Sequence, residues 1–204
     1  MLRLIRLGAF GLIAVLACIW AGVWWHGHAA PSLQAAVGVA PGVSVGGPFS
    51  LVDAQGAAVT DATYRGRWML VYFGYTTCPD VCPTELQAMS ATLDQLGPLA
   101  AQVAPIFITI DPERDTPAAL ADYVKQFDDR LVGLTGTPAQ VAAVARVYRV
   151  YFSKVEAKGG APYMMDHSSF LYLMGPDGSL RQLIQPNTPA PEIAAVIRQK
   201  MLAS

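Results

Sequence analysis

The sequence has few cysteines and few charges, and each shortage excludes a class of protein. Three cysteines in 204 residues are too few for a small fold that depends on several disulfide bonds for its stability. Charged residues make up only 14% of the chain, the net charge is −1 and no basic cluster is present, which argues against a nucleic-acid partner. Apolar residues reach 53%, so the chemistry must come from a small set of polar side chains.

The N-terminal segment has the pattern of a membrane anchor. Residues 7–25 form an uncharged apolar stretch about as long as a helix that spans a bilayer. Arg3 and Arg6 precede it, and the next lysine or arginine is Arg65. The positive-inside rule then predicts a cytoplasmic N-terminus at residues 1–6, one transmembrane helix at 7–25, and a periplasmic remainder on the far side of a bacterial-type inner membrane.

Two processing events are alternatives to an uncleaved anchor. Ala29 and Ala30 offer small residues for a signal peptidase, and Cys18 lies in a loose lipoprotein motif. The apolar run is long for a signal peptide and continues beyond Cys18, and bulky Trp24 and Trp25 make a poor approach to a cleavage site. We favour the anchor, which leaves two cysteines in an oxidising compartment, where neighbouring thiols pair unless metal or reductant protects them.

The exported part divides into a linker and one domain. Residues 26–46 carry no charge and are rich in Ala, Gly and Val, which is typical of a linker. His26 and His28, within it, are more typical of a membrane exit than of a metal site. Residues 47–204 are enough for a single domain with its own core.

The domain alternates between strand and helix patterns. Apolar runs predict strands, and 3.6-residue periodicity after capping signals predicts helices. After an initial hairpin, the order β-α-β-α-β-α-β-β-α describes an α/β mixed sheet with helices on both faces. The expected hairpin turns at 53–56, the strands lie at 68–73, 105–110, 131–134, 169–174 and 179–184, and the helices run from 82 to 97, from 117 to 127, from 138 to 148 and from 191 to 201.

Cys78 and Cys82 are the most informative residues, because they stand where an apolar strand gives way to a helix. Pro83 suits a first helical turn, so both sulfurs lie near a helix N-terminus, which favours an anion. Lowered thiol pKa values are therefore expected, with reactive or metal-binding sulfur, and a structural disulfide is the alternative. A cysteine pair at the end of the first core strand fits the thioredoxin-like class.

His167 supplies a third soft donor at the start of the C-terminal hairpin. In a thioredoxin-like sheet this loop passes beside the cysteine turn, and two thiolates with one imidazole suit Cu(I), or copper in general. Zinc would seek a fourth ligand, which Asp166 could supply, or Asp166 could orient His167 by a hydrogen bond. A loop histidine satisfied by a carbonyl is the alternative, and packing is the favoured role for Met164 and Met165.

The chain resembles the Sco/SenC family of copper chaperones, which serve cytochrome c oxidase assembly. The resemblance covers residues from about 46 to the end, and it is carried by three motifs: Phe73-Gly-Tyr-Thr-Thr-Cys-Pro-Asp-Val-Cys-Pro83, Asp111-Pro-Glu-Arg-Asp-Thr-Pro117 and Asp166-His-Ser168. It implies an anchored thioredoxin-like domain that binds one copper ion, as Cu(I) with Cu(II) tolerated, through Cys78, Cys82 and His167.

The resemblance also implies partners. They are a copper donor chaperone and, as acceptor, the dinuclear copper centre of oxidase subunit II or another copper protein. The Asp111–Asp115 segment is expected to be a charged turn near the site, and its aspartates are more typical of a solvated helix-capping loop than of metal ligands. A disulfide between Cys78 and Cys82 would exclude copper.

Three other functions fit part of the pattern. A thiol–disulfide oxidoreductase would use the same two cysteines, although three residues separate them where thioredoxins have two. A peroxidase of the peroxiredoxin type lacks its threonine, since Pro79 stands three residues before Cys82 and Tyr75 three before Cys78. A redox or copper sensor is not distinguished from a carrier by the sequence.

Overall fold

The structure is a computed structural model that describes residues 18, 20, 36–37, 44–156, 159 and 162–203. The chain divides into two units, residues 1–33 and residues 34–204. In the first, Cys18 and Trp20 are helical and exposed. The rest of the predicted cytoplasmic segment and anchor lies outside the described residues, as do His26 and His28. No helix within the described ranges is long and apolar enough to cross a membrane.

The second unit is built on a mixed sheet, as predicted, and this sheet has eight strands among the described residues. The three core strands β4, β5 and β6 are parallel neighbours, and the other pairings are antiparallel. Across the sheet the order is β1 (Ala36–Val37), β10 (Leu180–Ile184), β9 (Leu171–Met174), β4 (Trp68–Gly74), β5 (Val103–Thr109), β6 (Val132–Thr135), β2 (Ser50–Asp53) and β3 (Ala58–Thr60).

Among the described residues of this unit are four α-helices and the 3-10 segments η2 and η3, and the α-helices begin close to their predicted starts. Asp61–Tyr64 and Gly97–Gln102 are the 3-10 segments η2 and η3, the second of which follows the predicted helix end at Gly97. The α-helices are α2 (Val81–Leu96), α3 (Pro117–Lys125), α4 (Pro138–Val147) and α5 (Ala190–Leu202).

Threonine side chains cap the N-termini of two of these helices. Thr116 Oγ1 accepts a hydrogen bond from the Ala119 N–H at 3.2 Å, and Thr137 Oγ1 accepts one from the Gln140 N–H at 3.3 Å. A proline follows each threonine, where its missing N–H costs nothing. The Thr-Pro signals in the sequence therefore mark true helix starts.

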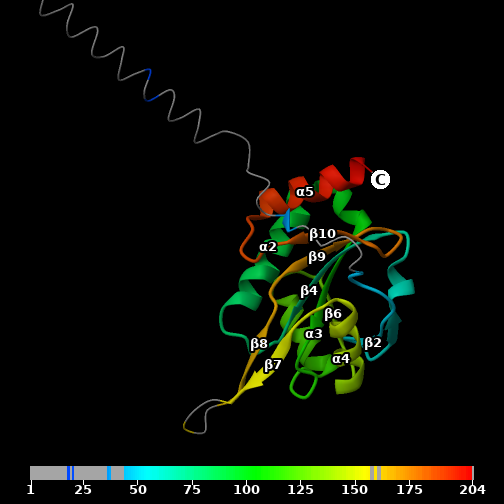
Figure 1. Cartoon of the computed structure of the whole chain (residues 1–204), viewed down its shortest axis with the longest axis vertical. Coiled ribbons are helices and arrows are strands. Elements are labelled where there is room, and N and C mark those ends of the chain that lie inside the picture. The colour runs from blue at the N-terminus through cyan, green and yellow to red at the C-terminus, as the bar shows by residue number, and fades with distance from the viewer. Residues whose placement is uncertain are drawn as a thin grey trace, which may run out of the picture. The chain divides into compact units, whose positions relative to one another are not determined.

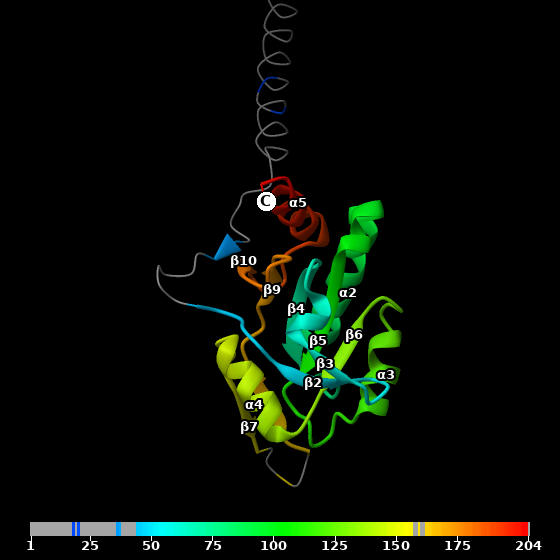
Figure 2. The same ribbon diagram turned by 90° about the vertical axis from the view of Figure 1, so that its right-hand side faces the viewer.

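Helices cover both faces of the sheet, as predicted. Tyr72 and Phe73 are neighbours on β4 and so point to opposite faces. Tyr72 stacks with Phe107, which contacts Tyr123 of α3. Phe73 packs against Tyr148, at the end of α4. Figure 2 shows α4 on one side of the sheet and α2 and α3 on the other.

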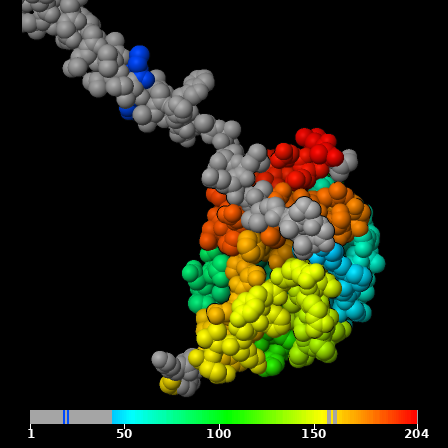
Figure 3. Space-filling model, in the orientation of Figure 1, coloured from blue at the N-terminus to red at the C-terminus, as the bar shows by residue number. Residues whose placement is uncertain are grey.

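A second, two-stranded sheet was not predicted. It pairs β7 (Phe152–Val155) with β8 (Met164–His167), at the other end of the unit from α5 (Figure 1). The sequence gives it little signal, because neither strand is a buried apolar run. In Figure 3 the yellow segments that include β7 form part of the molecular surface. His167 therefore lies on a strand of its own hairpin, not in a loop.

A further difference concerns the segment predicted as a linker, residues 26–46. Within it, Ala36 and Val37 pair with Ile184 and Leu183 of β10, so the sheet begins before residue 47. A two-residue strand has no periodicity that a sequence pattern can detect.

Gly74, the last residue of β4, is a point of close approach between the sheet and α2. A Cβ at this position would lie 2.8 Å from Cys82 Sγ and 2.8 Å from Phe107 Cε2, both closer than van der Waals contact allows. The absence of a side chain at Gly74 therefore lets Cys82 settle against the strand.

We expect Gly74→Ala to lower the free energy of unfolding by about 1–3 kcal/mol, because it overpacks a filled core. Urea unfolding followed by circular dichroism measures this. Gly133→Ala is a graded comparison, since its Cβ would meet Leu120 and Val124 at 3.2 and 3.3 Å, and we expect a smaller loss. Equal losses at the two positions would contradict the assigned role of Gly74.

Candidate metal centre

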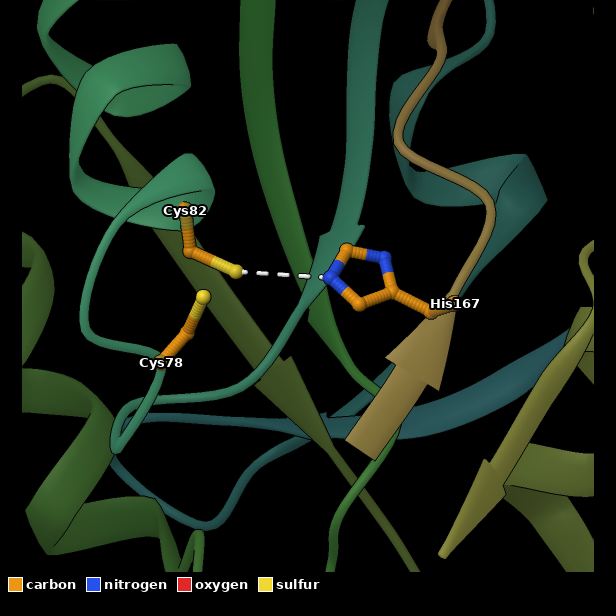
Figure 4. Close-up of side chains that lie close together, drawn as sticks. All are labelled: Cys78, Cys82 and His167. Carbon is orange, nitrogen blue, oxygen red and sulfur yellow. Dashed lines mark hydrogen bonds between the residues drawn. The ribbon is translucent and has the colours of Figure 1, made fainter. Parts of the chain in front are cut away.

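The structure brings Cys78, Cys82 and His167 together from three elements. Cys78 lies in the loop after β4, Cys82 in the first turn of α2, and His167 at the end of β8. Figure 4 shows the three side chains pointing toward one another. One ligand atom from each lies within 4.8 Å of the others, and Cys82 Sγ is 3.6 Å from His167 Nε2.

The imidazole of His167 presents Nε2 to the sulfurs. Its Nδ1 lies 3.0 Å from the carbonyl oxygen of Ser168, which can only accept a hydrogen bond. Nδ1 therefore carries the proton. In the neutral ring this leaves a lone pair on Nε2, the nitrogen that faces Cys82. The ring is thus held in the tautomer that a metal ligand needs.

The two thiols hold one proton between them. The neighbouring Cys82 thiol lowers the pKa of Cys78 to about 3, with further help from the backbone N–H groups of Asp80 and Cys82. The same interaction between the two thiols, together with burial, raises the pKa of Cys82. The first proton therefore leaves easily and the second is retained. The lowered pKa that the sequence predicted for both thiols holds for Cys78 and is wrong for Cys82, where burial and the neighbouring Cys78 sulfur oppose ionisation.

Two tyrosines, which the sequence analysis missed, complete the surroundings of the thiols. The Tyr72 hydroxyl donates to Cys82 Sγ at 3.8 Å, and burial raises the pKa of Tyr72, so this hydroxyl keeps its proton. Tyr75 meets the His167 ring edge-on, with centroids 6.0 Å apart, and it also hydrogen-bonds to the Cys78 side chain. Tyr72 could have been found by alternation along β4, since it shares a face with Gly74.

Comparisons with known proteins decide the family. The family model described as SCO1/SenC matches residues 39–202 of this chain. The chain belongs to the SCO1/SenC family. The predicted resemblance is confirmed.

Relatives and solved structures agree with this assignment. The human Protein SCO1 homolog, mitochondrial, is 47% identical over 159 residues, and the match covers 77% of this chain and 53% of that protein. The chain therefore spans about half the length of that relative.

Two solved structures of similar proteins are described as copper-bound. Bradyrhizobium japonicum ScoI with copper bound is 46% identical, with a TM-score of 0.71, and the match covers 76% of this chain and 99% of that chain. Arabidopsis thaliana ScoI with copper bound is 38% identical, with a TM-score of 0.75 and coverage of 79% and 100%.

In this SCO1/SenC chain the other predicted candidates stand outside the three-residue cluster. Asp166 is exposed and, as the neighbour of His167 on β8, faces away from it. The Ser168 carbonyl occupies the position at Nδ1 that Asp166 was expected to take, so a role for Asp166 stays a prediction. Met165 is buried in the core and Met164 is 38% exposed, in keeping with the packing role favoured for Met165.

The donor set of this SCO1/SenC chain fits a soft metal ion. Two sulfurs and one imidazole nitrogen lie within reach of a single ion, and of the residues that the structure describes, only these form such a cluster. Three soft donors suit Cu(I), which accepts low coordination numbers, better than zinc, which prefers four ligands. Cys78 is 9% exposed, Cys82 is fully buried and His167 is partly exposed, so the cluster is reached from the side of Cys78 and His167.

The lowered pKa of Cys78 predicts how its alkylation depends on pH. An anion with a pKa of about 3 is present above that pH, so the rate at Cys78 should change less than about twofold between pH 8 and pH 6. For an ordinary thiol with a pKa of about 8.5, the rate should fall roughly 80-fold over the same range. Iodoacetamide labelling with mass spectrometry of the Cys78 peptide measures this.

The matched variant for this experiment is Cys82→Ala, which removes the strongest donor to the Cys78 sulfur. We expect its Cys78 alkylation to slow as the pH falls, because the pKa moves back up. A steep pH dependence in the parent protein would contradict the shared-proton arrangement.

Proposed function

We propose that this protein is a copper chaperone that binds one copper ion through Cys78, Cys82 and His167. The observation that carries the proposal is the convergence of three soft donors within 4.8 Å, two of them sulfurs at the start of a helix. Family membership supports it, as do similar solved structures, which are described as ScoI and Sco1 with copper bound.

Binding of Cu(I) follows from the chemistry of these residues. Both thiols must be ionised to ligate the metal, so copper displaces the proton that Cys82 shares with Cys78. His167 adds neutral Nε2, already held in the correct tautomer by the Ser168 carbonyl. The Tyr72 hydroxyl donates to Cys82 Sγ and offsets part of the cost of a buried thiolate.

Release of copper follows from the unequal burial of the sulfurs. Cys78 is the more exposed of the two sulfurs, and Cys82 is fully buried against β4. His167 is partly exposed, so an incoming thiolate from an acceptor can replace His167 or Cys78 first and Cys82 last, by stepwise ligand exchange. We propose as acceptor the dinuclear copper centre of cytochrome c oxidase subunit II, with a separate copper donor chaperone, as the family resemblance implies.

A second function, reduction of a partner's disulfide, uses the same atoms. The favouring observation is that Cys78 is the outer sulfur, 9% exposed, with the fully buried Cys82 sulfur within 4.8 Å of it. Cys78 would attack the partner's disulfide and release one partner thiolate. Cys82 would then attack the mixed disulfide, which releases the second partner thiol and leaves a Cys78–Cys82 disulfide. The partner gains two electrons, and this protein loses two.

We also propose the domain organisation that the sequence predicts: residues 1–6 cytoplasmic, a single membrane helix at 7–25, a connecting segment, and a thioredoxin-like copper-binding domain, 47–204, in the periplasm. The uncharged stretch and the placement of Arg3, Arg6 and Arg65 support it.

Copper binding tests the ligand assignment. We expect the reduced protein to bind one Cu(I) tightly, and Cys78→Ala, Cys82→Ala and His167→Ala each to weaken the affinity by at least about tenfold, because each removes one of three donors. Competition with a chromogenic Cu(I) chelator measures the affinity.

Met164→Leu is the matched control for copper binding, because Met164 is a soft but exposed residue on the same strand as His167, and we expect parental affinity. Parental affinity in His167→Ala would contradict the three-ligand site. Absence of specific copper binding in the parent, with rapid reduction of a disulfide substrate, would instead favour the second function.

Membrane association tests the anchor. In a bacterial host we expect the full chain to stay with the membranes after carbonate extraction, and a chain lacking residues 7–25 to be released, because it has lost the apolar span. Cys18→Ser should remain in the membrane. Its release would identify lipidation at Cys18 as the attachment.

A further inference from the structure

The loop after β5 contacts the two segments that carry the proposed copper ligands. We call residues 111–115, Asp-Pro-Glu-Arg-Asp, the bracket loop. The sequence analysis expected its aspartates to cap a helix in solvent. Instead Asp111 is 1% exposed and Asp115 is fully buried, and their carboxylates bind residues far away in the sequence.

The first arm of the bracket loop is Asp115, which binds the loop that carries Cys78. The Asp115 carboxylate accepts hydrogen bonds from the Thr76 N–H at 3.1 Å and from the Thr76 hydroxyl at 2.5 Å. It also accepts one from the Thr109 hydroxyl, at 2.6 Å. Three donors satisfy this buried carboxylate, and two of them belong to the residue two positions before Cys78.

The second arm is formed by Asp111 and Arg114, which bind Tyr163 next to the strand that carries His167. The Tyr163 hydroxyl donates to the Asp111 carboxylate at 2.9 Å, and Arg114 Nη1 donates to the Tyr163 carbonyl oxygen at 2.9 Å. The Arg114 guanidinium lies over the Tyr163 ring, 3.8 Å from its centroid, and pairs with Asp111. Tyr163 immediately precedes β8, and His167 ends that strand.

Three observations indicate that the second arm positions His167. Arg114 Nη2 is buried and has no hydrogen-bond partner in the described part of the chain, so the guanidinium is kept there against a cost. The strands β7 and β8 pair with each other and with no strand of the larger sheet, so the sheet ladder does not place His167. Arg114 also lies 5.7 Å from the ring of Tyr75, which contacts the imidazole.

We propose that the bracket loop sets the separation between the thiol pair and the imidazole, with Asp115 positioning the cysteine loop and the Arg114–Tyr163 contact positioning His167. The inference rests on the proposed copper site for its consequence. Its structural part, the fastening of the β7–β8 hairpin, does not require copper.

The two arms predict different behaviour in a mutant cycle on the full chain. Outer contacts to metal ligands are commonly worth 10–100-fold in affinity, and we expect Tyr163→Phe and Arg114→Ala to weaken Cu(I) binding by about tenfold or more. In a His167→Ala background the same changes should have no further effect, because the residue they position is gone. Thr76→Val should weaken binding by a similar factor in both backgrounds, because it acts through the cysteine loop.

Two further variants separate position from general stability. Arg114→Lys keeps the charge and should recover part of the affinity lost in Arg114→Ala. Arg181→Ala removes an exposed arginine–aspartate pair in the β9–β10 turn and should leave the affinity at the parental value. If the Arg114 and Tyr163 variants weaken binding as strongly without His167 as with it, the assigned second arm is wrong.

Hydrogen exchange of the copper-free protein tests the bracket loop without the metal. We expect Arg114→Ala to speed amide exchange in β7 and β8 by roughly tenfold and to leave β4 and β5 unchanged. Unchanged exchange in the hairpin would overturn the proposal. If the parent protein binds no copper, the proposed function fails, and exchange in the hairpin alone decides whether the bracket loop fastens it.

Discussion

The parallel pairing of β4 with β5 is the constraint on which the site depends. The last residues of the two strands, Gly74 and Thr109, are partners in register, and the Ile110 N–H still donates to the Gly74 carbonyl oxygen beyond them, at 2.8 Å. Both strands therefore end at the same edge of the sheet. The loop after β4 carries Cys78 and the loop after β5 is the bracket loop, so the pairing brings the two together, as is general at the carboxyl ends of parallel strands.

Tight packing at this edge gives the two sulfurs unequal surroundings. Cys82 fits into the space left by the missing side chain of Gly74, away from water and beneath the Tyr72 hydroxyl. Cys78 stands slightly outside, against the backbone N–H groups that begin α2. Cys82 is thus fully buried and Cys78 lies nearer the surface, although only three residues separate them in the chain.

This inequality suits both of the functions proposed. Metal transfer needs one ligand that an acceptor can displace and others that hold the ion meanwhile. Disulfide exchange needs one accessible nucleophile and a second thiol behind it. Both reactions consume the same two thiolates, so a protein molecule whose Cys78–Cys82 pair is oxidised cannot carry copper, and copper protects the pair from oxidation.

The sequence by itself determined the order along the chain of the α-helices and of the main-sheet strands after β1, the helix starts at Thr116 and Thr137, and the place of the cysteines at a strand-to-helix turn. Each of these depends on signals within a few consecutive residues, such as apolar runs, caps and prolines. It also named the three side chains of the cluster, partly from their chemistry and partly through the family resemblance.

Only the tertiary structure decided how these side chains are held. The β7–β8 hairpin lacks a buried apolar run, and β1 is only two residues long, so neither has a pattern to read. The contact between Thr76 and Asp115 spans 39 residues, and that between Arg114 and Tyr163 spans 49. Contacts over such separations arise from the packing of the whole sheet, and no local pattern of residues encodes them.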